Sequence, residues 1–266
     1  MTTEFTHPVS LTIAGSDCSG GAGLQADLKA FLQHGVHGLS AVTSVVAETP
    51  LEVRRIDNVD VSLLQGQVRI LLETYPVGAI KTGMLPSRAS VIAVVELLRE
   101  VKCPLVVDPV MFASTGTALI DEAAIEVVSS RLLPCATLVT PNIPEAEWLS
   151  GQKINNESDM VAAAQAIAEK HQLACLLKGG HLTGQSELLD VLWCDGEAHE
   201  YRHPVVRTDG GFHGTGCTLS AAITANLAKG DTVPQAVQNG IDYLQKLMAN
   251  SVAWQSEGKE VRVLGW

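Results

Sequence analysis

The residues best suited to chemistry lie in one segment, His213–Ala222, which reads HGTGCTLSAA. Two glycines free the backbone just before a helix of small residues, so the first-turn amides would point at one spot, where the helix dipole adds positive potential. Such an anion hole suits a phosphoryl group in transfer. A thiol there is expected to have a lowered pKa, and Cys217 as thiolate would accept the proton of an attacking hydroxyl. The same segment also fits a glycine-rich helix start with an inert, buried cysteine.

Asn142 and Glu145 form a second candidate pair. Their spacing fits a capping box, in which Asn142 caps a helix and Glu145 reaches back to the cap, with Pro144 in the first turn. The same two side chains, at the sheet edge beside Asp108, would also hold magnesium through water, because Mg²⁺ prefers oxygen ligands and keeps several waters. Spacing alone does not separate these interpretations.

The glycine-rich segment that follows the first apolar run is a third candidate. Gly21–Ala26 fits the G-x-G-x-x-A pattern of dinucleotide binding, and Glu48 ends the next apolar run about where a ribose-binding acid belongs. The match, however, starts six residues after Gly15, whereas the fingerprint follows its strand almost at once. The loop could also simply turn the chain. Its number of glycines favours close approach of the backbone to a ligand.

Asp27 lies on the apolar stripe of the first predicted helix, three residues after Leu24 and four before Phe31. It therefore leans toward the core, near the start of that helix. A buried carboxylate needs hydrogen-bond partners. Either amides of the glycine-rich loop or donors on a bound substrate would supply them.

The elements that must position these residues alternate between short apolar runs and longer amphipathic segments. The predicted strands are Val9–Ala14, Ser40–Ala47, Val77–Thr82, Pro104–Val110, Ala136–Thr140, Ala174–Leu177 and Leu188–Trp193. The predicted helices are Leu24–Gln33, Ser62–Glu73, Ser87–Glu100, Glu122–Leu132, Asp159–His171, Thr218–Ala228 and Val233–Ala253. Near-continuous apolar strands joined by helices indicate one doubly wound, mainly parallel α/β domain over residues 1–266, with an antiparallel edge at Leu188–Pro204.

Polar or glycine residues end six of these apolar runs. The apolar residues Leu105–Val107 end in Asp108, Leu138–Val139 end in Thr140, and Leu176–Leu177 end in Lys178. Because the carboxyl ends of parallel strands share one edge of the sheet, these endings predict a small-molecule site there.

Composition limits the classes of partner. The 266 residues carry a formal charge of −11, with 46% hydrophobic residues and 18% charged ones. A sizeable core is expected, and nucleic acid or an anionic membrane surface is not the expected partner. No secretory signal or spanning segment is visible, and scattered cysteines without a CxxC pair fit a reducing compartment, so a cytoplasmic protein is expected.

Several motifs together resemble the hydroxymethylpyrimidine/phosphomethylpyrimidine kinases of thiamine biosynthesis. In chain order they are AGSD with GGAGLQADLK (residues 14–29), KTGML (81–85), DPVM (108–111), TPNIPEA (140–146), KGGH (178–181) and HGTGCTLS (213–220). They extend over nearly the whole chain, from about Val9 to Ala253.

The resemblance implies a ribokinase-like three-layer α/β/α fold, ATP and Mg²⁺ as cofactors, and a homodimer. The substrates it implies are 4-amino-5-hydroxymethyl-2-methylpyrimidine and its monophosphate, each phosphorylated by ATP. By the same resemblance, the pyrimidine would contact Asp27, Glu48, Met84 and Val110, and the anion hole would be Gly214 to Gly216. The nucleotide would contact Lys178, Asn142 and Thr208, magnesium would be held at Glu145 and Asp108, and Cys217 would occupy the base position.

Two positions depart from the family. Glu48 replaces a usual glutamine, and an ionised carboxylate only accepts hydrogen bonds, so it would oppose a ring nitrogen unless that nitrogen or the carboxyl were protonated. Phe212 replaces a threonine before His213.

Three alternatives stay open at this point. They are a pyridoxal kinase that uses the same site, a nicotinamide-dependent oxidoreductase based on Gly21–Ala26 and Glu48, and a non-catalytic pyrimidine-binding sensor.

Overall fold

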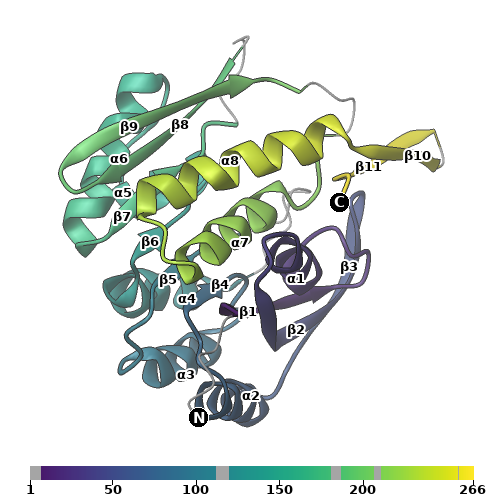
Figure 1. Ribbon diagram of the computed structural model, residues 1–266, viewed down its shortest axis with the longest axis vertical. Helices are drawn as coiled ribbons and strands as arrows, with labels where there is room; N and C mark the ends of the chain where they lie inside the picture. Colours follow the sequence, from purple (N-terminus) through teal and green to yellow (C-terminus); the bar gives the residue numbers. More distant parts are fainter. Residues whose placement is uncertain (1–6, 112–119, 181–186, 207–210, 257) are drawn as a thin grey trace.

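The computed structural model describes residues 7–111, 120–180, 187–206, 211–256 and 258–266. Within them, a nine-stranded sheet runs in the order β3-β2-β1-β4-β5-β6-β7-β8-β9 (Figure 1). The strands are β1 (Val9–Asp17), β2 (His37–Thr49), β3 (Glu52–Asn58), β4 (Ala79–Thr82), β5 (Leu105–Val107), β6 (Leu138–Val139), β7 (Ala174–Leu177), β8 (Glu187–Cys194) and β9 (Glu197–Pro204). Six neighbouring strands pair in parallel, in the order β2, β1, β4, β5, β6 and β7. At the two edges, β3, β8 and β9 pair antiparallel.

Helices cover both faces of the sheet. They are α1 (Gly23–Gln33), α2 (Val61–Thr74), α3 (Arg88–Leu98), α4 (Glu122–Val127), α5 (Ile143–Ser150), α6 (Glu157–His171), α7 (Thr215–Ala228) and α8 (Val233–Ala249). Side chains alternate along each strand, so Leu105 and Val107 of β5 pack with α2 to α6, while Val106 packs with α7 and α8. Helix α1 joins the second layer through Phe31, which packs against Ala221 and Ala225 of α7. The three-layer α/β/α architecture expected from the sequence is therefore confirmed.

The predicted strands and helices all occur, with three differences. The segment Glu122–Leu132 is not one helix, because α4 ends at Val127 and a π-helical turn, Val128–Leu132, follows it. The predicted helix Val233–Ala253 ends at Ala249 instead, because the chain from Val252 onward pairs as β10 (Val252–Ser256) with β11 (Lys259–Val263). Strands β3, β10 and β11 were absent from the predicted elements, and α5 was expected only through the capping box at Asn142 and Glu145.

None of the helices in the described parts of the chain combines the length and the apolar character needed to cross a bilayer.

Candidate active site

The N-terminus of α7 adopts a conformation that requires glycine. Gly214 caps the helix with φ 78°, and a Cβ atom on it would lie 1.9 Å from the carbonyl oxygen of Gly21. The amides of the next three residues belong to the first turn of a helix, where N–H groups have no intrahelical acceptor. Helix α7 thus presents free donors and the positive end of its dipole at the position predicted for the anion hole.

Asp17, the last residue of β1, connects this helix start to the glycine-rich loop. Its Oδ2 accepts hydrogen bonds from His213 Nε2 at 2.9 Å and from the amides of Gly21 at 3.1 Å and Ala22 at 2.7 Å. Burial alone would raise the pKa of Asp17, but the hydrogen bonds from His213, Ser19 and the loop amides hold it at about 2. The carboxylate is therefore ionised and fixes the two loops against each other.

The dinucleotide interpretation of Gly21–Ala26 is wrong. The amides of Gly21 and Ala22, which a pyrophosphate would need, are already taken by the Asp17 carboxylate. Because that acceptor belongs to the protein itself, these two amides are not free to bind a pyrophosphate.

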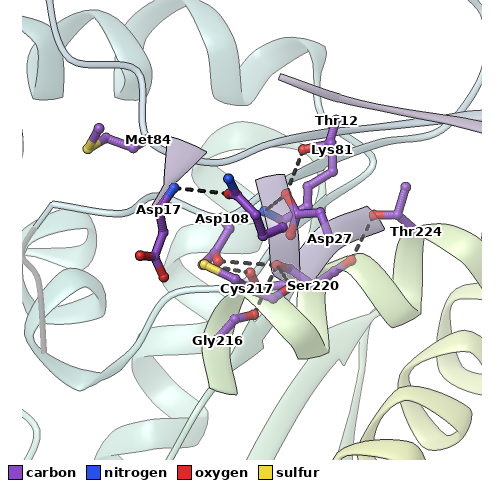
Figure 2. Close-up of polar contacts among 12 residues, drawn as sticks. Thr12, Asp17, Asp27, Lys81, Met84, Asp108, Gly216, Cys217, Ser220 and Thr224 are labelled. Atoms are coloured by element: carbon purple, nitrogen blue, oxygen red, sulfur yellow. Dashed lines mark hydrogen bonds and ion pairs between the residues drawn. The ribbon is translucent and has the colours of Figure 1, made fainter. Parts of the chain in front are cut away.

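Asp27 lies in α1, fully buried, and its partners in the protein are side chains, not amides of the glycine-rich loop. Its Oδ2 accepts a 2.6 Å hydrogen bond from Thr12 Oγ1 and forms a 2.9 Å ion pair with Lys81 Nζ (Figure 2). Burial disfavours the charged form of Lys81, yet the charge of Asp27 outweighs it and raises the lysine pKa above its ordinary value. The expected pairing with loop amides is therefore wrong. The role of Asp27 toward a substrate stays a prediction.

Asp108 follows β5 and collects donors from three other elements. Its carboxylate accepts hydrogen bonds from Lys178 Nζ at 3.2 Å, Thr140 Oγ1 at 3.3 Å and Ser220 Oγ at 3.1 Å. Burial opposes ionisation, but the charges of Lys178 and Lys81 lower the pKa of Asp108 below its usual value. Asp108 thus stays ionised at the end of the sheet, directly beside α7.

Lys178 reaches the start of α7 from the end of β7. A Cβ atom on Gly216 would lie 3.3 Å from Lys178 Nζ and 3.9 Å from Asp108 Oδ2. The structure therefore brings the ammonium group, the Asp108 carboxylate and the first turn of α7 together, as the strand endings predict.

The capping box at the start of α5 is confirmed. Asn142 Oδ1 accepts from the Glu145 amide at 3.0 Å, and Glu145 Oε2 accepts from the Asn142 amide at 2.9 Å. Glu145 Oε1 also accepts from the Met111 amide at 3.3 Å. Burial, helped by the nearby charge of Asp108 and opposed by Lys178, raises the pKa of Glu145 to about 7.

The donor set around Glu145 is compatible with magnesium but does not form a dedicated metal cage. Within the described ranges, no three His, Cys, Asp or Glu side chains converge as metal ligands. Mg²⁺ in nucleotide sites uses one or two carboxylates and completes its shell with waters and phosphates. Asp108 and Glu145 fit that requirement. Both are buried carboxyls, and the negative charge of one makes ionisation of the other more costly, so a cation between them would relieve their repulsion.

The predicted pyrimidine contacts lie on the β1–β2 side of the site and beyond β5. Glu48 follows the buried part of β2, where Cys18 Sγ donates to its carbonyl at 3.3 Å, and burial together with the charge of Asp17 raises the pKa of its side chain. The Met84 side chain lies against Gly15, and a Cβ atom on Gly15 would lie 2.8 Å from the Met84 methyl carbon. Val110 lines a small, largely apolar pocket with Asp108.

The cysteine prediction needs a correction. Cys217 is partly buried in the first turn of α7, and burial raises the pKa of its thiol to about 12, although the charge of Lys81 and a hydrogen bond from the Gly23 backbone lower it. Desolvation of the thiol therefore outweighs the expected lowering of its pKa by the helix terminus. The thiol is protonated unless something further stabilises its anion.

Thr208, predicted to contact the nucleotide, lies outside the described residues. The structure also assigns importance to residues that the sequence reasoning passed over, namely Thr12, Asp17, Lys81, His213 and Ser220. A signal was present for Asp17 and Lys81, since both stand among the polar residues that end the apolar strand runs.

The chain is similar to known proteins over most of its length. The sequence profile of a family described as phosphomethylpyrimidine kinase matches residues 17–262. A hydroxymethylpyrimidine/phosphomethylpyrimidine kinase of Streptomyces coelicolor is 43% identical over 244 residues, which cover 91% of this chain and 89% of that protein.

Two solved structures are also similar. The crystal structure of a phosphomethylpyrimidine kinase from Clostridium difficile has 37% identity and a TM-score of 0.80, and the match covers 90% of this chain and 98% of that one. The pyridoxal kinase of Staphylococcus aureus in complex with AMP-PCP and pyridoxal has 32% identity and a TM-score of 0.85, and the match covers 97% and 93% of the two chains. The ribokinase-like fold implied by the sequence resemblance is confirmed by these neighbours.

Proposed function

The chain belongs to the phosphomethylpyrimidine kinase family, and we propose that the site described above carries out the family's reaction. The protein is a kinase of thiamine biosynthesis, which phosphorylates 4-amino-5-hydroxymethyl-2-methylpyrimidine and then its monophosphate. The nucleotide-analogue complex of a structural neighbour supports ATP as the donor. The observation that carries the site is the meeting of the α7 N-terminus with Lys178 and Asp108 beside the Cys217 sulfur.

In this proposal, the transferring phosphoryl group lies at the start of α7. The amides of Gly214, Thr215 and Gly216 donate to its oxygens, and the dipole of a 14-residue helix favours the charge that develops there. Lys178 supplies a full positive charge against Gly216. Such preorganised donors stabilise the transition state because they need no reorientation as the reaction proceeds.

Cys217 acts as base for the first phosphorylation. As the hydroxymethyl oxygen attacks the γ-phosphorus, its proton passes to the Cys217 thiolate, and the bond from that phosphorus to the β–γ bridging oxygen breaks to release ADP. The thiol then returns its proton to solvent. The high pKa of Cys217 means that the thiolate needs help from neighbouring charges.

Glu145 and Asp108 would hold magnesium together with nucleotide phosphates. The metal would neutralise phosphate charge, and Asn142 would contact the nucleotide beside it. What the protein contributes is a carboxyl whose pKa, about 7, leaves it ready to lose its proton when a cation approaches.

The acceptor ring would lie between Glu48, Met84 and Val110, with Asp27 deeper in the core. A pyridoxal-type alcohol is a second candidate acceptor, favoured by the similarity to a pyridoxal kinase over 97% of the chain. The oxidoreductase and the non-catalytic sensor are both set aside by membership of a kinase family.

We further propose a homodimer, as the family resemblance implies, one catalytic domain over residues 1–266, as the alternation of strands and helices indicates, and a cytoplasmic location, as the scattered cysteines indicate. Sedimentation equilibrium tests the dimer, and a single cooperative unfolding transition tests the domain.

The experiment for the function is ADP release over a panel of pyrimidine and pyridine alcohols and their monophosphates, with and without Mg²⁺. The pyrimidine alcohol and its monophosphate should both yield ADP. Turnover of pyridine alcohols alone would overturn the assignment of the substrate.

A further inference from the structure

Asp190 is a charged residue at an apolar position of β8. On the same face of that strand, Leu192 and Cys194 are buried and pack with the apolar side chains of α8, and strand alternation predicts another apolar residue here. The Asp190 side chain is nevertheless only 8% exposed. Burial of a carboxylate is costly unless hydrogen bonds satisfy it, so the partners of Asp190 indicate what it does.

One oxygen of Asp190 holds the loop that carries Lys178. Asp190 Oδ1 accepts a 2.8 Å hydrogen bond from the amide of Gly179, the residue after Lys178. The two backbones are in close contact, since a Cβ atom on Gly179 would lie 1.9 Å from the Leu189 carbonyl oxygen. The Lys178 amide in turn donates to the Pro141 carbonyl oxygen at 2.9 Å, so the amides of both loop residues are fixed.

The other oxygen of Asp190 is oriented from α8 through His203 of β9. Because Gln245 Nε2 can only donate, His203 Nδ1 accepts this 2.9 Å hydrogen bond and the ring carries its proton on Nε2. That N–H donates to Asp190 Oδ2 at 3.1 Å. Helix α8 packs against β8 and β9 (Figure 1), and these hydrogen bonds connect it to the loop after β7.

Lys178 is the functional side chain that this connection places. Its ammonium group pairs with Asp108 at 3.2 Å, and a Cβ atom on Gly216 would lie 3.3 Å from its Nζ. A lysine side chain already loses rotamer entropy when it is held in one place, and a mobile backbone beneath it would scatter the charge further. Fixing the backbone at Lys178 and Gly179 therefore determines where the charge meets a phosphoryl group.

We propose that Asp190, oriented by His203 and Gln245, is a positioning residue that holds the Lys178 ammonium group against the start of α7 for phosphoryl transfer. The proposal rests on the proposed role of Lys178 in the reaction. Both phosphorylations transfer the same group from the same nucleotide, so loss of Asp190 should slow the two steps alike. The KM for each acceptor should stay unchanged, because Asp190 acts on the side of the donor.

A double-mutant cycle tests the proposal, because a residue that acts only through Lys178 has no effect once the ammonium group is gone. Asp190→Leu removes the hydrogen-bond acceptor at an apolar position and should lower turnover roughly tenfold to hundredfold, as for a misplaced catalytic group. In a Lys178→Met background, the same change should alter turnover by less than about twofold. An equal loss in both backgrounds, the signature of a merely structural role, overturns the proposal.

Two further variants complete the comparison. Asp190→Asn keeps an oxygen that accepts from the Gly179 amide and should recover most of the turnover. Tyr201→Phe is the matched control, because the Tyr201 hydroxyl donates to the Pro234 carbonyl oxygen at 3.2 Å and connects β9 to α8 without reaching the loop. Its turnover should equal that of the wild type. Asp190→Asn no faster than Asp190→Leu, or Tyr201→Phe equally slow, overturns the proposal.

Hydrogen exchange at the Gly179 amide, measured by NMR, is a readout without catalysis. The amide should exchange slowly in the wild type and about tenfold faster in Asp190→Leu, because its buried acceptor is lost. If that variant does not fold, His203→Leu takes its place in the cycle and in the exchange measurement. Unchanged exchange overturns the proposal.

The role of Lys178 itself is tested by Lys178→Met alone. If this variant turns over as fast as the wild type, the proposed function of Lys178 fails, while the exchange rates still decide whether Asp190 holds the loop.

Discussion

Gly214 approaches Gly21 so closely that a single methyl group on Gly214 would overlap the Gly21 carbonyl oxygen. This contact joins the start of α7 to the glycine-rich loop without any side chain between them, and Asp17 reinforces it through His213. The two loops therefore behave as one rigid unit, and the predictions below begin with that unit.

Gly214→Ala should abolish most of the turnover. The residue has φ 78° and its Cβ would lie 1.9 Å from a backbone oxygen, so the start of α7 must move away from the acceptor. The matched control is Gly35→Ala, with φ 69° and nothing within 4 Å. Left-handed strain of about 1 kcal/mol is expected in both. Thermal denaturation should show a larger loss of stability at Gly214, because the overlap with the backbone oxygen adds to the left-handed strain, and turnover should fall only at Gly214.

Cys217→Ala should slow the first phosphorylation by roughly the 10²–10⁴-fold typical of lost acid–base assistance. The second phosphorylation should be affected far less, because its acceptor is already deprotonated. Single-turnover measurements on the alcohol and on its monophosphate separate the two. Equal rates for wild type and variant on the alcohol would remove Cys217 from the base position.

Asp17 should make the fold acid-sensitive. Its pKa is about 2 in the folded protein, below the ordinary value of 3.8, so it adds stability that is complete above about pH 4 and is lost as pH falls toward 2. The contribution is about 2 kcal/mol. Asp17→Asn should lower the free energy of unfolding at neutral pH and flatten its dependence in this acid range, as chemical denaturation across pH will show. Asp57→Asn, at an exposed pair with Arg55, serves as the control.

Glu145 should couple stability to magnesium. Its pKa is raised to about 7, so ionisation of this buried carboxyl costs stability as pH rises from its ordinary value of 4.5 through 7. A bound cation removes that cost, so Mg²⁺ with a nucleotide should raise the melting temperature more at about pH 8 than at about pH 6. Glu145→Gln should lose this pH-dependent difference. A response to Mg²⁺ that is the same in both proteins argues against Glu145 as a ligand.

Glu48 should make acceptor binding pH-dependent. Burial and the neighbouring Asp17 raise the pKa of Glu48, and only its protonated form can donate to a ring nitrogen. The KM for the pyrimidine alcohol should therefore rise as Glu48 ionises, with kcat changed less. In Glu48→Gln, whose amide both donates and accepts, KM should be flat over the same range. A parallel pH dependence in the two proteins would place the ring elsewhere.

The fold was largely predictable because the spacing of apolar residues and the polar residues that end the strands mark most of its elements. Val9–Ala14 and Ala174–Leu177 are largely apolar runs, and both occur as interior strands, β1 paired in parallel on both sides and β7 paired in parallel with β6. Strand β3 was missed because it is polar, with Arg54 and Arg55 exposed at the sheet edge and no apolar run to mark it. The overlong α8 arose because Val252 and Ala253 continue a helical pattern but pair with β11 instead.

The sequence predicted which residues meet at the site better than it predicted their protonation states and hydrogen-bond partners. Asp108 and Lys178 follow the ends of parallel strands, so the topology of the sheet alone predicts that they meet at one edge. The protonation of Cys217 and the partner of Asp27 depended on burial and on Lys81, which lies 54 positions away from Asp27 in the chain. Such long-range contacts and desolvation have no local signature in the sequence.

The hydrogen bond between Asp17 and His213 spans 196 positions along the chain, and β1, which ends at Asp17, is an interior strand of the sheet. Loop closure over such a separation is a slow, entropically costly event in folding. During synthesis on the ribosome, the strand that carries Asp17 emerges long before its histidine. The candidate site is consequently assembled only when the last third of the nascent chain returns to the first, and a fragment that ends before His213 lacks the contact that joins its two loops.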